Sequence, residues 1–384
     1  MGEFKRASLA ELFKFFVTMG CTAFGGPAAH LAIMQREAVE KRGWMSRQEF
    51  LDVYGLLNLI PGPNSTQMVM YFGHRHGGVA GMFVAGFGFI LPAAAITLAI
   101  ALAYVRYGAL PFAQAILWGV QPIVIAVIAS AMWRLVPSGL DNWTKRAVFV
   151  GAAATALLGV REVFVVLGSG LLMWLWRSRL KLPAWPKGSG VSPWGLALLT
   201  GAAIGLETAT VSAANLFFAF TRIAWVLYGS GYLLVAYMQA ELVDRLGWLS
   251  VQQMLDVLAM GQMTPGPFLT TATAAGMVIG GLPGAVAATV GIFWPSFLLI
   301  GLLGGYVPRL RNSKFGQHFL AGVNAAVVAL LLLVAGRFIQ GVVDEPVRLG
   351  VAALSLFALE RFKLNSMLLL VLGAAFGLAW HMFL

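Results

Sequence analysis

The sequence predicts an all-α polytopic membrane protein made of two homologous repeats of inverted topology, with broken or re-entrant helices at Gly/Pro motifs. Three observations support this fold class: long apolar stretches, an internal duplication, and Gly/Pro interruptions at equivalent positions of the two repeats. Of the 384 residues, 59% are hydrophobic and only 11% are charged, whereas soluble domains carry roughly 25% charged residues. This composition excludes a soluble enzyme and a nucleic-acid-binding protein.

Three stretches, residues 77–105, 107–133 and 257–308, contain no Asp, Glu, Lys or Arg. Each is long enough to cross a bilayer, which takes about 20 residues. The net charge of +11 comes from Lys and Arg in short gaps between apolar runs, where cytoplasmic loops collect positive charge. We therefore expect a multi-pass protein with the lipid bilayer as its surroundings and no nucleic-acid partner. The lone Cys21 and the scattered histidines predict no metal and no cofactor.

The chain repeats itself at an offset of 204 residues, which shortens to 203 after a one-residue slip. Residues 31–66 align with 235–270, and glycines and prolines further along recur in the same way, as at Pro92 and Pro295. The duplication predicts a first repeat at 1–176, a basic linker containing Pro, Gly and Ser at 177–193, and a second repeat at 194–384.

The basic residues of matched loops indicate that the repeats are inverted. The loop 36–49 holds four Lys or Arg residues and its partner 240–253 holds one, whereas the loop at Arg106 holds one and its partner 309–314 holds three. Positive charge marks the cytoplasmic side, so the excess changes sides between the repeats. Inverted repeats are typical of secondary transporters.

Paired helix breaks sit at equivalent positions of the two repeats. Residues 46–60 suit a helix that begins at Ser46, and Pro61-Gly62-Pro63 then interrupts it. The second repeat has the same device at Pro265-Gly266-Pro267, and a further break at Phe24-Gly25-Gly26-Pro27 has a degenerate counterpart at Tyr228-Gly229-Ser230-Gly231. The segments on either side are too short to cross alone, so each motif predicts a re-entrant hairpin or a discontinuous helix.

Such breaks are the sequence signal of a transporter's binding site. A half-helix that begins after a break presents free N–H groups and a partial positive charge, which favours an anion. Side chains that could add hydrogen bonds to oxyanion oxygens are Asn64, Ser65, Thr66, Thr270 and Thr271. The alternative is that the Gly/Pro motifs only kink packed helices.

Several ionisable residues admit two interpretations. His30 could bind an anion, carry a proton or be structural, and Glu207 could couple charge or lie at a helix end. Arg36 and Arg75 could attract an anion to a cytoplasmic mouth or be ordinary loop arginines. For the recurring acids we favour a structural role, capping helices or pairing with Arg36, Arg42 or Arg245; these acids are Glu37, Glu241, Asp52 and Asp256.

The motifs together resemble those of a known family. FGGPAAHLAIMQRE at 24–37 and RGWMSRQEFLDVYGLLNLIPGPNSTQ at 42–67 closely resemble the amino-terminal domain of chromate ion transporters. GWLSVQQMLDVLAMGQMTPGPFLTTAT at 247–273 and GAVAATVGIFWPSF at 284–297 resemble the carboxy-terminal domain. The similarity covers nearly the whole chain, in the long two-domain form of the family.

The resemblance implies an inner-membrane carrier that exports chromate and thereby confers chromate resistance, with sulfate as the related dianion. The two repeats with their opposed half-helix ends predict transport by alternating access. The sequence leaves open whether the protein forms a homodimer. Substrate-binding residues carried over on matching motifs are Gly25, Gly26, Pro27, His30, Pro61, Gly62, Pro63, Asn64, Pro265, Gly266, Pro267 and Thr270. Because the second repeat lacks the FGGP motif, we expect the first repeat to hold most substrate contacts. The alternatives are a carrier of sulfate or another oxyanion, or an intramembrane enzyme, for which the sequence shows no clustered His/Asp/Glu set.

Overall fold

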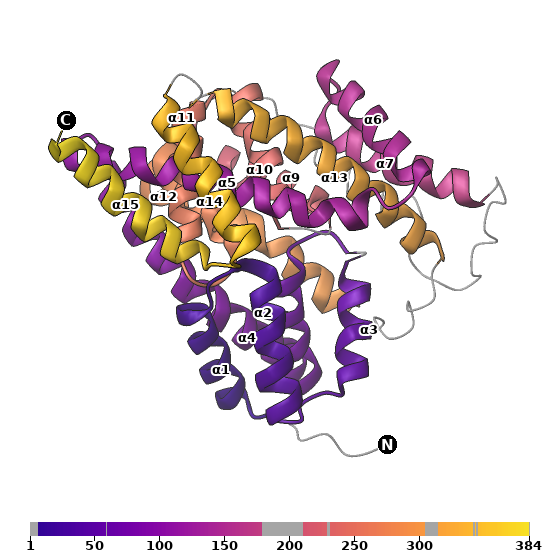
Figure 1. The fold of residues 1–384 in the computed structure, drawn as a ribbon. Coiled ribbons are helices and arrows are strands. Elements are labelled where there is room, and N and C mark those ends of the chain that lie inside the picture. The colour runs from indigo at the N-terminus through magenta and orange to yellow at the C-terminus, as the bar shows by residue number, and fades with distance from the viewer. Residues whose placement is uncertain are drawn as a thin grey trace.

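The computed structural model describes residues 7–58, 60–178, 210–228, 231–303, 314–340, 342 and 345–383. All regular secondary structure in these ranges is helical (Figure 1), as predicted. Glu207 and most of the expected 177–193 linker lie outside the described residues, so the repeat boundaries stay a prediction. Five described helices are long and apolar enough to cross a membrane: Asn64–Tyr107, Pro111–Pro137, Phe268–Leu302, Gln317–Gln340 and Ser366–Phe383.

The two halves of the chain form the same succession of helices. The first half contains α1 (Leu9–Thr22), α2 (Gly26–Met34), the π-helical η1 (Gln35–Lys41), α3 (Arg47–Leu57), α4 (Asn64–Tyr107), α5 (Pro111–Gly139), α6 (Trp143–Leu157) and α7 (Glu162–Ser178). The second half contains α9 (Ala213–Val226), α10 (Leu233–Met238), the π-helical η2 (Gln239–Arg245), α11 (Val251–Met263), the short 3₁₀ turn η3 (Phe268–Thr270), α12 (Thr271–Leu303), α13 (Lys314–Gln340), α14 (Pro346–Arg361) and α15 (Ser366–Phe383).

Each half begins with two helical hairpins. In the first, α1 runs in and α2 with η1 runs back, so that the Arg42 guanidinium lies 5.1 Å from the centroid of the Phe15 ring. In the second, α3 runs in and the start of α4 runs back, which brings Glu49 within 2.9 Å of Arg75. The Ala7 N–H donates to His76 Nδ1 at 3.2 Å, so the open ends of both hairpins lie at one face. The Gly/Pro breaks are therefore hairpin tips.

A second reversal divides α4 into two antiparallel arms. Gly77 and Gly78 have non-helical dihedral angles, with φ of +59° at Gly78. Gly73 and Gly81 then pack so closely that a Cβ on either would overlap the carbonyl oxygen of the other. After the turn the chain continues as the long apolar arm 79–107. The second half repeats the turn at 280–281, in α12.

The long arms of α4 and α12 are equivalent helices, and they run antiparallel. A Cβ on Gly86 would lie 2.6 Å from the ring of Phe297, and a Cβ on Gly301 would lie 3.5 Å from Met82. Moving four residues back along α4 thus moves four residues forward along α12. Equivalent elements in opposite directions confirm the inverted topology predicted from loop charges.

The later helices are exchanged between the halves. The first-half helix α5 packs on α14 and α15, and the second-half helix α13 packs on α6 and α7 (Figure 1). Small residues allow these helices to approach closely. A Cβ on Gly119 of α5 would overlap the carbonyl oxygen of Gly373, and one on Gly322 of α13 would overlap that of Ser169. Because of this exchange, neither half packs without the other.

Candidate anion-binding site

The tips of the hairpins from both halves meet inside the protein. The Gly62 N–H donates to the Leu227 carbonyl at 2.6 Å, and the Gly266 N–H donates to the Ala23 carbonyl at 2.8 Å. These bonds are equivalent under the repeat, since each joins a Pro-Gly-Pro loop to the end of the first helix of the other half. Non-helical backbone buried away from water needs such partners. The predicted breaks are thus brought together in one place.

Helices that begin at the tips are capped differently from those that begin at the outer faces. The outer starts are capped by Ser8, Ser46, Ser212 and Ser250, whose side chains accept backbone N–H groups. Among the described residues, no side chain caps α2, α4, α10 or η3, which begin at the tips. The first N–H groups of a helix have no intrahelical acceptor. A buried, uncapped helix start is suited to an anion.

The start of α4 is rich in buried polar side chains. Asn64, Ser65 and Thr66, which the sequence predicts to bind the oxyanion, are all buried there. Within the part of the chain that the structure describes, the Thr66 hydroxyl and the Gln67 Oε1 have no hydrogen-bond partner. The Gln67 side-chain amide donates to the Pro61 carbonyl at 2.6 Å. The first tip therefore carries polar groups that the protein itself leaves available.

The second tip is less polar. The Thr270 hydroxyl donates to the Pro267 carbonyl at 2.9 Å, and the Thr271 hydroxyl donates to the Phe268 carbonyl at 2.6 Å. Both hydroxyl hydrogens are therefore already used by the local backbone. This difference agrees in direction with the expected inequality of the two halves.

His30 lies at the first tip, fully buried. Its Nε2 is 3.3 Å from the Ala23 carbonyl, and its Nδ1 is 3.5 Å from the Ser65 hydroxyl. Because a carbonyl only accepts, Nε2–H donates to Ala23, and in the neutral ring Nδ1 accepts from Ser65. The Ala23 carbonyl oxygen thus accepts hydrogen bonds from both His30 and Gly266. These contacts support the structural interpretation of His30.

The glycines of the FGGP motif have the backbone role expected of them. Gly25 and Gly26 have φ of +103° and +72°, a region that other residues rarely adopt. Pro27 follows in the first turn of α2, where its fixed φ suits a helix start. The motif therefore forms the reversal between α1 and α2.

Two cavities, which we call the first and the second mouth, lie along the first hairpins of the two halves. The first mouth has a volume of about 530 Å³ between α1 and η1, and its charged lining residues are Glu11, Lys14, Arg36, Glu37 and Arg42. The predicted Arg36 thus lines a cavity while pairing with Glu37 at 3.1 Å. Arg75 is outside that lining and pairs with Glu49.

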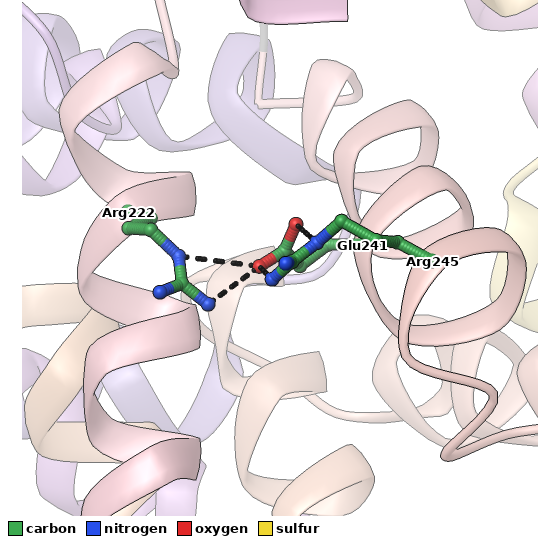
Figure 2. A network of polar contacts seen from close by, with 3 residues as sticks. All are labelled: Arg222, Glu241 and Arg245. Atoms are coloured by element: carbon green, nitrogen blue, oxygen red, sulfur yellow. Dashed lines mark hydrogen bonds and ion pairs between the residues drawn. The ribbon is translucent and has the colours of Figure 1, made fainter. Parts of the chain in front are cut away.

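The second mouth, about 450 Å³, lies between α9 with η2 on one side and the α6–α7 turn of the first half on the other. Figure 2 shows the Glu241 carboxylate between two arginines: Arg222 Nη2 is 2.7 Å from Oε1, and Arg245 Nε is 2.8 Å from Oε2. This confirms the predicted pairing of Glu241 with Arg245. The sequence did not reveal Arg222, because the equivalent residue of the first half is Thr18.

Replacing Glu241 with Gln should lower stability in a pH-dependent way. Burial raises the pKa of the Glu241 carboxyl, but hydrogen bonds from Arg245 and the charges of both arginines outweigh burial and hold it below its ordinary value of 4.5. A lowered folded pKa stabilises above the unfolded pKa, and that stabilisation is lost as pH falls through the folded value. We expect a loss of about 2 kcal/mol at pH 7, shrinking below pH 4.5.

Thermal unfolding in detergent from pH 7 to pH 3.5 measures this difference. The matched control is Glu37→Gln, because Glu37 pairs with Arg36 and Lys41 at the exposed first mouth. That variant should change the unfolding temperature little at any pH. A Glu241→Gln effect that is constant with pH would contradict the electrostatic explanation.

The prediction that Asp256 caps a helix or pairs with a neighbouring arginine is wrong. Asp256 is 5% exposed, and its carboxylate accepts hydrogen bonds from Tyr104 at 2.8 Å and from Gln121 at 2.6 Å. The Gln121 carbonyl oxygen in turn accepts from the buried Arg348. Asp256 therefore joins the second-half hairpin to α4 and α5 of the first half, which the linear sequence does not show.

The chain is similar to known proteins over almost its whole length. The profile of the family described as "Chromate transporter" matches twice, at residues 10–174 and 214–378. A probable chromate transport protein of Synechococcus elongatus is 32% identical over 96% of this chain and 95% of its own length. A chromate transport protein of Cupriavidus metallidurans is 30% identical over 96% of this chain and 92% of its own.

A chromate transport protein of Pseudomonas aeruginosa is 31% identical over 84% of this chain and 79% of its own length. No solved structure matches this chain. The double profile match repeats the duplication seen in the helices, and the relatives match across both halves. The chain therefore belongs to the chromate transporter family, as a multi-pass membrane protein of two repeats.

Proposed function

We propose that this protein exports chromate across the inner membrane as a secondary carrier. The observation that carries the proposal is the buried, uncapped start of α4, where Asn64, Ser65 and Thr66 surround N–H groups without intrahelical acceptors. Chromate is a tetrahedral dianion that accepts hydrogen bonds on every oxygen, so a site made of donors suits it. The names of the relatives support the same substrate.

The proposed mechanism is alternating access. The tips of the two halves are joined by reciprocal hydrogen bonds, and each half has one mouth along its first hairpin. The first mouth lies beside the loop 36–49, whose four basic residues favour the cytoplasmic side. A dianion attracted there would reach the first tip and leave by the second mouth when the halves rock about the site.

The membrane potential is a sufficient driving force for export. Moving one charge across 100 mV is worth about 2.3 kcal/mol, so a dianion leaving a cell that is negative inside gains about 4.6 kcal/mol. Coupling to protons is consequently optional. If protons are coupled, His30 and Glu207 are the proposed carriers, and His30 would have to release its contacts with Ala23 and Ser65.

Sulfate is the second candidate substrate, because it has the same charge and tetrahedral shape as chromate. The hydrogen-bond donors at the start of α4 would bind either dianion. Competition between the two dianions distinguishes a chromate carrier from a general one. A preference for sulfate would make sulfate the main substrate, with uptake as the alternative direction, and chromate would be transported only because it resembles sulfate.

Chromate uptake into inside-out vesicles tests the proposal. We expect uptake above that of empty vesicles, inhibited by sulfate and abolished when an ionophore collapses the potential. Sulfate inhibition with no dependence on the potential would support the substrate and contradict electrogenic export. Uptake equal to that of empty vesicles, with the protein correctly inserted, would overturn the proposal.

A further inference from the structure

A hydroxyl from the second half of the chain lies at the first tip. Ser296 follows Pro295 in α12, is fully buried, and its Oγ has no hydrogen-bond partner among the described residues. A buried polar group without a partner costs free energy. An unpaired group of this kind in a native structure calls for an explanation, such as a ligand.

Ser296 lies against the Pro-Gly-Pro loop of the first half. A Cβ built on Gly62 would be 2.6 Å from Ser296 Oγ and would overlap the side-chain nitrogen of Gln67. Gly62 has φ of +125°. Because it is a glycine, Ser296 and Gln67 can occupy the space where another residue would place its Cβ. Ser296 thus reaches the loop that precedes the uncapped start of α4. Thr66, whose hydroxyl has no hydrogen-bond partner among the described residues, lies in the first turn after this loop.

The equivalent position at the second tip is apolar. Ala93 follows Pro92 as Ser296 follows Pro295, and a Cβ on Gly266 would lie 2.6 Å from the Ala93 methyl group. The threonines beside that loop use their hydroxyls on local carbonyls. The repeat therefore places a spare donor at the first tip and a methyl group at the second.

We propose that Ser296 binds the substrate oxyanion by donating its hydroxyl to it, together with the Thr66 hydroxyl and the first N–H groups of α4. The chain then has one oxyanion site, at the first tip, built from both halves. This inference rests on the proposed transport of a dianion and names a residue that completes its site.

A site of this composition links binding to the movement of the halves. Thr66 is on the short first arm of α4, in the first half, and Ser296 is on the long arm of α12, in the second half. An oxyanion held by both keeps the two helices together. When the halves rock apart, one set of donors leaves the ligand, and its affinity falls on the side where release is needed.

Kinetics in proteoliposomes test this role. Ser296→Ala removes the hydroxyl and leaves a residue that the equivalent position already accommodates as Ala93. A hydrogen bond to a charged ligand is worth roughly tenfold or more in affinity. We therefore expect the KM for chromate and for sulfate to rise about tenfold, with Vmax changing much less.

The matched control is Ala93→Ser, which adds a hydroxyl at the second tip and should leave both KM values within about twofold of wild type, since the effect of a hydrogen bond is larger. Ser296→Cys keeps a small side chain with a weaker donor and should give an intermediate KM. The protection that sulfate gives against thermal unfolding should fall in Ser296→Ala in parallel with its KM. Cysteine is the variant to measure if alanine does not insert.

The outcomes separate this inference from the proposed function. If wild-type protein takes up neither dianion, the proposed function fails. If wild type transports and folded Ser296→Ala keeps its KM and its sulfate protection, the site lacks Ser296 and the inference alone is overturned. An equal KM rise in Ala93→Ser would also overturn it, because both tips would then bind.

Discussion

Replacing Gly266 with Ala should reduce chromate uptake to the level of empty vesicles. Gly266 has φ of +88°, and an added Cβ would lie 2.6 Å from the Ala93 methyl group and 2.9 Å from the Gly20 carbonyl oxygen. Both neighbours are held by helices, so neither can give way as a flexible side chain would. The loop must then move, and the bond from its N–H to the Ala23 carbonyl is lost.

The expected cost combines two effects of similar size. Overpacking a close contact costs about 1–3 kcal/mol, and the left-handed backbone costs a residue with a Cβ about 1–2 kcal/mol. The matched control is Gly247→Ala in the same half, which has φ of +63° and, within the described residues, no atom within 4 Å of the added Cβ. It carries the backbone cost alone and should retain transport.

Uptake into vesicles, normalised to the inserted protein, measures both variants. Equal losses in Gly266→Ala and Gly247→Ala would show that the left-handed backbone alone matters. Transport by Gly266→Ala at the wild-type rate would contradict the close packing of the tips.

The contrast between these glycines shows what the sequence could and could not reveal. Pro-Gly-Pro at equivalent positions predicts two breaks, because proline cannot continue a helix and glycine permits the turn. The pattern does not say which carbonyl receives the Gly62 or Gly266 N–H, since both partners lie at the ends of helices in the other half. The inverted arrangement was predictable from loop charges, whereas the exchange of α5 and α13 depends on small-residue contacts between distant segments.

Only the part of the candidate site that follows the Pro-Gly-Pro break directly in sequence was predictable. Asn64, Ser65 and Thr66 stand directly after the break, so a helix start identifies them. Ser296 is more than 200 residues away from them in sequence. The available signal was a serine in a charge-free stretch, at a position where the other repeat has Ala93. Only the structure shows that this serine lies against Gly62 of the first tip.

Asp52 and Asp256 illustrate why identical residues of two repeats can have different roles. They are equivalent in the alignment, yet Asp52 is partly exposed and accepts from Gln48 at 3.0 Å, while Asp256 is buried against Tyr104 and Gln121. The residues equivalent to Gln121 and Arg348 are Asn324 and Lys145. The surroundings have therefore diverged although the acid has not.

Replacing Asp256 with Asn should strongly destabilise the protein. The variant keeps the shape of the side chain but removes the negative charge that faces Arg348 through the Gln121 amide. Arg348 is itself 5% exposed and retains Glu345 at 3.2 Å as its remaining acidic partner. The asparagine NH2 group would replace one carboxylate oxygen that accepts from Tyr104 or Gln121, and a hydrogen bond to a charged group is worth about 1.5–3 kcal/mol, so we expect a loss of about 2–3 kcal/mol.

Thermal unfolding of the purified protein measures this loss against Asp52→Asn, whose partly exposed site should change stability by no more than about 0.5 kcal/mol. The double variant Asp256→Asn with Arg348→Met removes both charges that contact Gln121, and residues of one hydrogen-bond network are expected to couple. It should therefore lose less than the two single variants added together. Additive losses would show that Asp256 and Arg348 act independently, and equal losses at Asp52 and Asp256 would show that the repeat, rather than the exchanged packing of the halves, determines the role of the acid.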